Sequence, residues 1–329
     1  MNDRRRVGLA LTGTLAFFLA VQLGALWLQA PFATAEYQAV EDPTNPANSL
    51  LYIGVLLVAT VGMLALLKYD LTRILRAFIV LTSGLISAYV FSVFVPPIVG
   101  EPGTLHLGAL LGGAAIVLGL AVYPEWWVID TAALIMGMGA AALFGISLGV
   151  FPVLLLLTAL AVYDAISVYG TEHMLTLASG VMELRVPVLI VIPTTLSFSF
   201  REQASAMADE TGENETETQE SESQQTPADP FDRDAFYIGL GDVVIPTILV
   251  VSAATFFEMP TVLGVEMASA GAITGTLLGL GALLYFVMKG RPHAGLPLLN
   301  GGAITGYLIG ALIGGLSLVE ALGITPYLG

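Results

Sequence analysis

The stretch FYIGLGDVVIPTILVV, residues Phe236 to Val251, opens an apolar run that continues to Phe257 and is long enough to cross a membrane. It contains one carboxylate, Asp242, directly behind Gly239-Leu240-Gly241. A charged side chain is costly in hydrocarbon, so acidic residues inside such segments are rare and are usually functional. The function of this protein therefore depends first on what Asp242 does.

The composition is that of a polytopic membrane protein. Of the 329 residues, 56% are hydrophobic and only 11% are charged, whereas a soluble domain usually carries about 25% charged residues. There is no cysteine, which excludes disulfides, thiolate catalysis, iron–sulfur clusters and cysteine-type zinc sites. The three histidines stand at scattered positions. We therefore expect no metal and no cofactor, and we expect the lipid bilayer rather than nucleic acid as a partner.

Nine apolar runs approach or reach the length of a membrane-crossing helix, which is about 20 residues. The first follows Arg4-Arg5-Arg6 like a signal peptide, but it is too long for one and is interpreted as a retained helix. The chain is therefore predicted to be all-α, with nine transmembrane helices. The predicted spans are residues 7–28, 50–67, 77–95, 105–122, 128–147, 150–169, 236–257, 268–288 and 295–318.

The basic residues predict that the N-terminus is cytoplasmic and the C-terminus is outside. In this orientation all eleven Lys and Arg fall on the cytoplasmic side, as the positive-inside rule requires. The chain then divides into residues 1–170 with spans one to six, a cytoplasmic loop at 171–235, and residues 236–329 with spans seven to nine. The expected location is the cell membrane.

The cytoplasmic loop is acidic, because 11 of the 26 acidic residues lie between Glu202 and Asp234. Its middle, ADETGENETETQESESQQTPADP, has almost no apolar residue and is expected to be disordered. Two neighbouring pieces are less polar. Thr171–Met182 fits a short amphipathic helix at the membrane interface, and Val186–Ile192 is too short to span and fits a strand or an interfacial segment.

A second deep carboxylate, Asp164, lies in LTALAVYDAISVYG of span six. It is six residues from the cytoplasmic end of that span, and Asp242 is six residues into span seven, so at ~1.5 Å per residue both lie roughly 9 Å deep. Two antiparallel spans thus bring one Asp each to the same level, and neither span supplies a Lys or Arg as counter-ion. Asp70 and Asp130, close to cytoplasmic ends, fit ordinary helix-end charges or hydrogen-bonding partners.

Two unpaired carboxylates at close range can perform general acid–base hydrolysis. They cannot both ionise cheaply, so one keeps a proton. The ionised group can take a proton from a water molecule while the protonated group donates to a carbonyl oxygen. This chemistry needs neither a metal nor a covalent intermediate, which agrees with the absence of Cys and the scarcity of His.

Glycine and proline residues flank the two carboxylates. Gly239 and Gly241 leave one face of the helix start bare, so that a backbone or an extended substrate can approach closely. Pro297, just inside span nine, frees a backbone carbonyl near the same depth, although it also fits a simple helix-start proline. The four-residue spacing of Gly271, Gly275 and Gly279, and of Gly302, Gly306, Gly310 and Gly314, indicates two packing faces.

Three short motifs then occur in order. Tyr163-Asp164 lies in span six, Gly239-Leu240-Gly241-Asp242 in span seven, and Pro297-Leu298-Leu299 opens span nine. They resemble the presenilin and signal-peptide-peptidase family, whose pattern is Tyr-Asp, Gly-x-Gly-Asp and Pro-Ala-Leu. The span number and the long loop between the two Asp-bearing spans match as well, and the chain is most similar to an archaeal presenilin homologue.

The resemblance implies an intramembrane aspartyl protease, a hydrolase that cuts transmembrane helices of membrane-protein substrates near the cytoplasmic side. It implies that Asp164 and Asp242 are the catalytic pair, and that a strand in the loop, here Val188–Ile192, pairs with unwound substrate. It also implies substrates whose N-terminus is outside. The residues it assigns to substrate binding are Tyr163, Gly239, Leu240, Gly241, Pro297, Leu298 and Leu299. Leu298 stands where the family has Ala, which changes the packing expected there.

Two alternatives account for parts of the pattern. A prepilin-peptidase-like aspartyl protease also uses Gly-x-Gly-Asp, but it explains neither Pro297 nor the order of the spans. A proton-coupled membrane transporter could use the Asp pair as a proton relay, but an odd number of spans and the lack of an internal repeat fit it poorly. The natural substrate, accessory subunits and oligomeric state are not indicated by the sequence.

Overall fold

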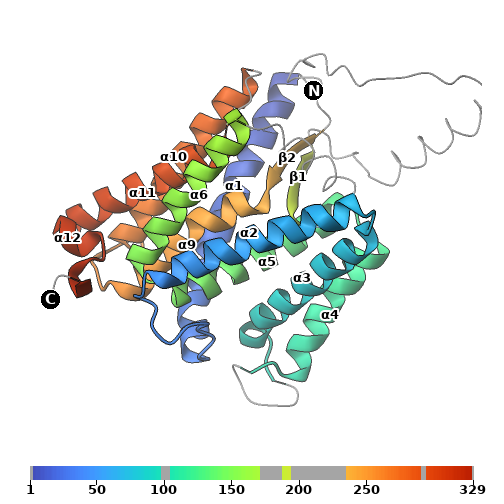
Figure 1. The fold of residues 1–329 in the computed structure, drawn as a ribbon, viewed down its shortest axis with the longest axis horizontal. Helices are drawn as coiled ribbons and strands as arrows, with labels where there is room; N and C mark the ends of the chain where they lie inside the picture. Colours follow the sequence, from blue (N-terminus) through green and yellow to red (C-terminus); the bar gives the residue numbers. More distant parts are fainter. Residues whose placement is uncertain (1–2, 98–103, 171–186, 194–234, 290–293, 328–329) are drawn as a thin grey trace, which may run out of the picture.

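The computed structural model of the protein describes residues 3–97, 104–170, 187–193, 235–289 and 294–327, and it consists mostly of long helices (Figure 1). The helices are α1 (Asp3–Thr34), α2 (Ala47–Lys68), α3 (Thr72–Phe94), α4 (Leu107–Val122), α5 (Trp126–Ser147), α6 (Val150–Gly170), α9 (Leu240–Phe256), α10 (Met267–Met288), α11 (Gly295–Ile313) and α12 (Leu318–Ala321). Two antiparallel strand pairs complete the fold: β1 (Leu189–Pro193) with β2 (Ala235–Gly239), and β3 (Thr261–Val262) with β4 (Val265–Glu266).

The prediction of a polytopic helical membrane protein agrees with these helices. Seven of them, α1, α2, α3, α5, α6, α10 and α11, are long and apolar enough to cross a membrane, within the part of the chain that the structure describes. The apolar helices α4 and α9 are shorter. Each predicted span coincides with one helix, because an uninterrupted apolar run in lipid must satisfy its backbone hydrogen bonds internally. The count of nine crossings stays a prediction.

The helices form two groups around a centre made by α1 and α5. On one side α3 packs against α4, and on the other α6, α9, α10 and α11 lie together (Figure 1). Helix α5 also packs against α9, so the centre connects the two groups. The largest buried apolar cluster lies among α6, α9, α10 and α11, and smaller clusters involve α1 and α5.

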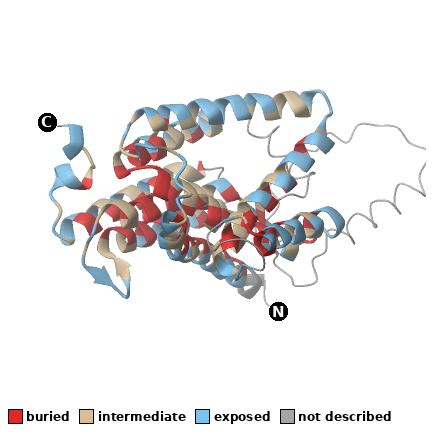
Figure 2. Cartoon of the chain, turned by 90° about the horizontal axis from the view of Figure 1, so that it is seen from below, coloured by how far each residue is buried: buried red, intermediate tan, exposed pale blue. Residues whose placement is uncertain are grey.

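Many large apolar side chains are exposed on the outside of this bundle, where long stretches of helix are exposed (Figure 2). Helix α2 is the clearest case, because Leu50 and Val58 are each 73% exposed and the only buried residue of the helix is Ser49. Such a surface would be unfavourable in water but is expected against lipid tails, which are as apolar as leucine. The exposure pattern is therefore that of a protein surrounded by a bilayer.

Helices α10 and α11 pack through their glycines, as the four-residue spacing predicted. A Cβ built at Gly271 or Gly275 would lie closer than 3.0 Å to the carbonyl oxygen of Gly306 or Gly302, respectively. Since only glycine lets two helix backbones approach this closely, the glycine positions in α10 and α11 determine how these two helices pair. Gly314 is an exception: it caps the end of α11 and faces the side chain of Met259.

The predicted helix from Phe236 is wrong at its start. Residues Ala235–Gly239 form strand β2, which pairs with β1, and the helix begins only at Leu240. The backbone groups of this segment are satisfied by the partner strand, and Gly239, with φ −63° and ψ 132°, serves as the extended N-cap of α9. Asp242 is therefore the third residue of its helix rather than a residue two turns inside it.

The last helix is also shorter than predicted, because α11 ends at Ile313 rather than near Leu318. Gly315 follows with a φ of 100°, a conformation that favours glycine and ends the helix. The chain then folds back through α12, where the hydroxyl of buried Tyr307 donates a hydrogen bond of 2.5 Å to the carbonyl oxygen of Ala321.

The strand expected at Val188–Ile192 is present as β1, one residue later, and its partner is β2. The acidic middle of the loop and the amphipathic segment Thr171–Met182 lie outside the described residues.

Candidate active site

Asp164 lies in the last third of α6, and its side chain is buried with 6% exposure. Its Oδ2 accepts a hydrogen bond of 3.0 Å from the backbone N–H of Leu296, at the start of α11. A side chain of α6 thus serves as the N-terminal cap of a different helix, which is an electrostatically favourable place for a negative charge.

Proline explains why α11 presents these groups to α6. Pro297 is the third residue of α11 and has no N–H, so the donors available in the first turn are those of Ala294, Gly295 and Leu296. The N–H of Ala294 donates to the hydroxyl of Tyr169, at 3.4 Å, near the end of α6. Side chains of α6 therefore accept hydrogen bonds from two of these three donors.

Asp242 lies in the first turn of α9, close to the same turn of α11. A Cβ built at Gly295 would lie 3.6 Å from Asp242 Oδ2, and one built at Gly239 would lie 3.4 Å from the same atom. Leu296, whose N–H binds Asp164, directly follows Gly295, so both carboxylates lie at the same turn of α11. Helices α6 and α9 pack together, and the first turn of α11 contacts both acidic groups.

A buried apolar cluster holds the starts of α9 and α11 in place. Leu240 of α9 and Leu299 of α11 belong to one buried cluster, which also contains Ile190 of β1 and Leu280 of α10. Ile190 and Leu299 have no exposed surface. Because the middle residue of the Gly-Leu-Gly-Asp motif and the last residue of Pro-Leu-Leu pack into the same cluster, their helix starts are held at a constant separation.

Asn300 adds a polar contact between α11 and α6. It is fully buried, and its Nδ2 donates a hydrogen bond of 2.9 Å to the carbonyl oxygen of Leu157. Leu157 lies seven residues before Asp164 on α6, and Asn300 lies four residues after Leu296 on α11, so the two contacts hold the same pair of helices together. No sequence motif marked Asn300, Gly295 or Leu296 as site residues.

The other predicted site residues, Gly241, Tyr163 and Leu298, have different surroundings in the structure. Gly241 is exposed, and a Cβ there would meet only the Ile245 side chain at 3.9 Å, so its face is open. Tyr163 is 50% exposed on the outside of α6. The carbonyl of Leu298 faces α10, where a Cβ at Gly279 would lie closer than 3.0 Å to it. Gly241 therefore borders the carboxylates, whereas Tyr163 faces outward.

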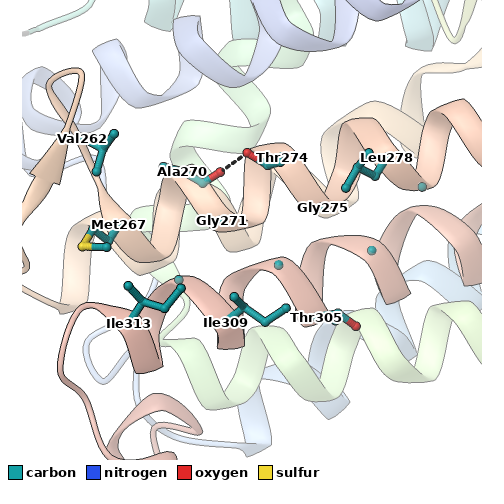
Figure 3. A pocket seen from close by; sticks show the side chains of 14 residues that line it. Val262, Met267, Ala270, Gly271, Thr274, Gly275, Leu278, Thr305, Ile309 and Ile313 are labelled. Carbon is teal, nitrogen blue, oxygen red and sulfur yellow. Dashed lines mark hydrogen bonds between the residues drawn. The ribbon is translucent and has the colours of Figure 1, made fainter.

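An apolar groove of about 450 Å³ lies between α10 and α11, away from the two carboxylates (Figure 3). Its walls include Gly275, Leu278, Thr305 and Ile309. Neither Asp164 nor Asp242 lines it, so its position does not bear on the chemistry. Within the described residues, no group of three or more His, Cys, Asp or Glu side chains lies together as metal ligands would.

The fold and the site together define a helical membrane protein with a pair of carboxylates between adjacent helices. A family model described as signal-peptide peptidase, presenilin aspartyl protease matches residues 15–316. A presenilin family intramembrane aspartate protease, solved in the C222 space group, is 34% identical, with a TM-score of 0.64, over 92% of this chain and 99% of that chain. Its structure in the P2 space group is 34% identical, with a TM-score of 0.60, over 92% and 97%. A comparison with curated proteins gives no match.

The chain belongs to the signal-peptide-peptidase and presenilin family, and it is an intramembrane aspartate protease. The family acts on transmembrane substrates within the bilayer. The resemblance found in the three sequence motifs is thereby confirmed. Both alternatives, the proton-coupled transporter and the prepilin-type peptidase, lose their basis, because the match extends over nearly the whole chain.

Proposed function

We propose that Asp164 and Asp242 are the catalytic pair of this protease and that they hydrolyse a peptide bond through one activated water molecule. The observation that carries the proposal is the first turn of α11, which donates a hydrogen bond to Asp164 and lies against the carboxylate of Asp242. A single rigid element therefore holds both groups in place, as preorganised catalysis requires.

The two carboxylates take different roles. The backbone N–H of Leu296 and the start of α11 stabilise a negative charge on Asp164, so we assign it the ionised form. Asp242 keeps the proton, because two close carboxylates cannot both ionise cheaply. The water oxygen attacks the carbonyl carbon while a water proton passes to Asp164 and the Asp242 proton passes to the carbonyl oxygen. Asp164 then protonates the leaving nitrogen, Asp242 recovers its proton from the diol, and the C–N bond breaks.

Substrate is proposed to enter as an extended segment beside β2. A transmembrane helix hides its amides in internal hydrogen bonds, so several residues must unwind before water can attack. Strand β2 leads directly into Gly239-Leu240-Gly241-Asp242, and the open face at Gly241 gives room for the unwound segment. Gly239, Leu240, Gly241, Pro297, Leu298 and Leu299 are proposed to shape this site, together with Tyr163 at its margin.

We further propose the topology predicted from the sequence: nine spans, the N-terminus in the cytoplasm, the C-terminus outside, and the site near the cytoplasmic face of the cell membrane. Lys68 at the end of α2, Arg73 at the start of α3 and Lys289 after α10 support it. In an alternating bundle these ends lie on the same side as the end of α6 and the start of α9. The division into residues 1–170, 171–235 and 236–329 is proposed on the same basis.

Cleavage of an oriented substrate tests this function. The purified protein is reconstituted into liposomes with a tagged single-span peptide inserted in either orientation, and the products are identified by mass spectrometry. We expect cleavage when the N-terminus of the peptide is on the side of the membrane opposite the carboxylates. In the proposed topology α6 runs toward the cytoplasm and α9 runs away from it, which is the arrangement that the resemblance to presenilins associates with such substrates. Cleavage of the opposite orientation alone would contradict the proposed topology, and cleavage of neither would contradict the function.

The pH dependence of cleavage should be bell-shaped. At low pH both carboxylates are protonated and no base remains, so kcat/KM falls; at high pH the second proton is lost and no acid remains, so kcat/KM falls again. The two apparent pKa values of such a profile belong to the pair rather than to either residue. Initial rates from pH 4 to pH 9, with a thermal unfolding curve at each pH as control, provide the check. A rate that only increases toward high pH would contradict the paired mechanism.

A further inference from the structure

Asp130 makes a contact that neither the catalytic chemistry nor helix packing requires. It is the fifth residue of α5, and its Oδ1 accepts a hydrogen bond of 2.8 Å from the backbone N–H of Val191 in β1. Strand β1 lies against α5 and α1 (Figure 1). The sequence predicts that Asp130 is a helix-end charge or a hydrogen-bonding partner, and the structure shows its partner to be the edge of a strand.

The register of the hairpin identifies which edge this is. Val191 stands opposite Tyr237, and the next pair toward the helix is Ile190 opposite Ile238. The N–H of Leu240 donates to the carbonyl oxygen of Val188, at 2.8 Å. In an antiparallel pair, alternate residues exchange hydrogen bonds with the partner, and those between them point outward. Val191 is one of the latter, so its N–H points away from β2 toward Asp130.

The same alternation places Leu189 and Pro193 on the outer edge of β1. Proline has no N–H, so it cannot donate to an additional strand, and the Val191 donor is already occupied by the Asp130 carboxylate. On β2 the residues opposite these are Ala235, Tyr237 and Gly239, whose backbone groups face away from β1. Two of the three outer positions of β1 thus have no N–H left for a partner strand, whereas β2 runs directly into the turn that carries Asp242.

Both faces of β1 are also buried. Ile190 has no exposed surface and packs in the cluster of Leu240 and Leu299, while Val191, 2% exposed, packs with Ile129 and Ala132 of α5. A slip of one residue would exchange these two side chains between faces. The Asp130 hydrogen bond and the two apolar contacts therefore select the same register.

We propose that Asp130 is a positioning residue for proteolysis: it occupies the outer edge of β1 and fixes the hairpin register, and so holds β2 and the Gly239–Asp242 turn that follows it in place for extended substrate. This inference rests on the proposed function. Without the carboxylate, the buried Val191 donor has no partner and the hairpin loses its anchor on α5. Substrate then docks less tightly and in more than one position, although the two catalytic groups themselves are unchanged.

The test compares Asp130→Ala and Asp130→Asn with Thr131→Ala in the full-length protein. Asn keeps an oxygen that can accept from Val191, whereas Ala does not. Thr131 is exposed on the same helix and bonds only the carbonyl oxygen of Trp127, at 2.7 Å, so its replacement removes one side-chain hydrogen bond without touching β1. The measurements are kcat and KM, the masses of the cleavage products, and hydrogen exchange of the peptide containing residues 188–193.

For Asp130→Ala we expect a roughly tenfold loss of kcat/KM carried mainly by KM, products cut at neighbouring bonds, and about tenfold faster exchange in β1. Asp130→Asn and Thr131→Ala should both behave like the wild type. If Asp130→Ala does not fold, Asp130→Ser, whose hydroxyl is too short to reach the strand, should give the same pattern.

Three results would overturn the inference: unchanged exchange and product masses in Asp130→Ala, a loss of kcat at constant KM with a single product, or an Asp130→Asn variant as defective as Asp130→Ala. A wild-type protein that cleaves nothing would instead refute the proposed function. The exchange measurement does not depend on activity, so the two failures remain distinguishable.

Discussion

Asp164→Asn and Asp242→Asn should each lower kcat on the order of 10³-fold or more, because each removes one of the two groups that move protons in the reaction. The substitution is nearly isosteric. An Asn at position 164 can still accept the Leu296 hydrogen bond through its side-chain oxygen, so the α6–α11 contact should survive. Cleavage of the tagged transmembrane peptide under single-turnover conditions measures the effect.

The matched control is Asp70→Asn. Asp70 is an exposed acid in the turn between α2 and α3, with a φ of 55°, a conformation that Asn tolerates well. Its replacement removes one negative charge without touching either helix start at the site, and activity should stay at the wild-type level. Thermal unfolding of all three variants separates loss of chemistry from loss of fold. Substantial cleavage by either site variant, with the fold retained, would refute the assignment of the pair.

Gly275→Ala should destabilise the protein by about 2 kcal/mol, the cost expected when a methyl group is forced into a well-packed contact. Its Cβ would lie closer than 3.0 Å to the carbonyl oxygen of Gly302, and backbone atoms cannot move aside as a flexible side chain can. Helices α10 and α11 would have to separate, and α11 carries the turn that binds Asp164. A lower midpoint of thermal unfolding and a parallel loss of activity are therefore expected.

Gly281→Ala is the control on the same helix. Gly281 is exposed and has no atom within 4 Å of its Cβ position. Alanine favours a helix over glycine by about 1 kcal/mol, so this variant should be as stable as the wild type or more stable. Equal midpoints for the two variants would show that the glycine faces of α10 and α11 do not determine how closely these helices pack.

The sequence was sufficient to single out the two acidic residues. An acidic side chain is energetically unfavourable in lipid, so an acid inside an apolar segment is easily recognised from the sequence alone. A single Asp in an otherwise apolar segment is conspicuous, and the positions of Lys and Arg bring Asp164 and Asp242 to one level without a structure. The start of α9 could not be located in this way. The residues Ala235–Gly239 are as apolar as the helix that follows, and hydropathy does not distinguish a strand from a helix in so short a run.

Leu296 was missed for a different reason. Its contribution is a backbone N–H, which every residue except proline possesses, so no side-chain pattern marks it. Pro297 was the available signal: a proline in the first turn removes one donor and leaves those before it to an external acceptor. That the acceptor is Asp164 depends on how α6 and α11 cross, which local sequence does not specify.

By itself, the sequence of this protein determined its class, its long apolar helices and the packing faces of α10 and α11, and it singled out two acidic residues as candidates for the site. These follow from transfer free energies and residue spacing, which act locally along the chain. Only the tertiary structure decided that the first turn of α11 contacts both Asp164 and Asp242, that β2 replaces the first turn of the expected helix, and that Asp130 binds the backbone of β1. Each of these joins segments distant in sequence, and the crossing of packed helices selects which backbone groups meet which side chains.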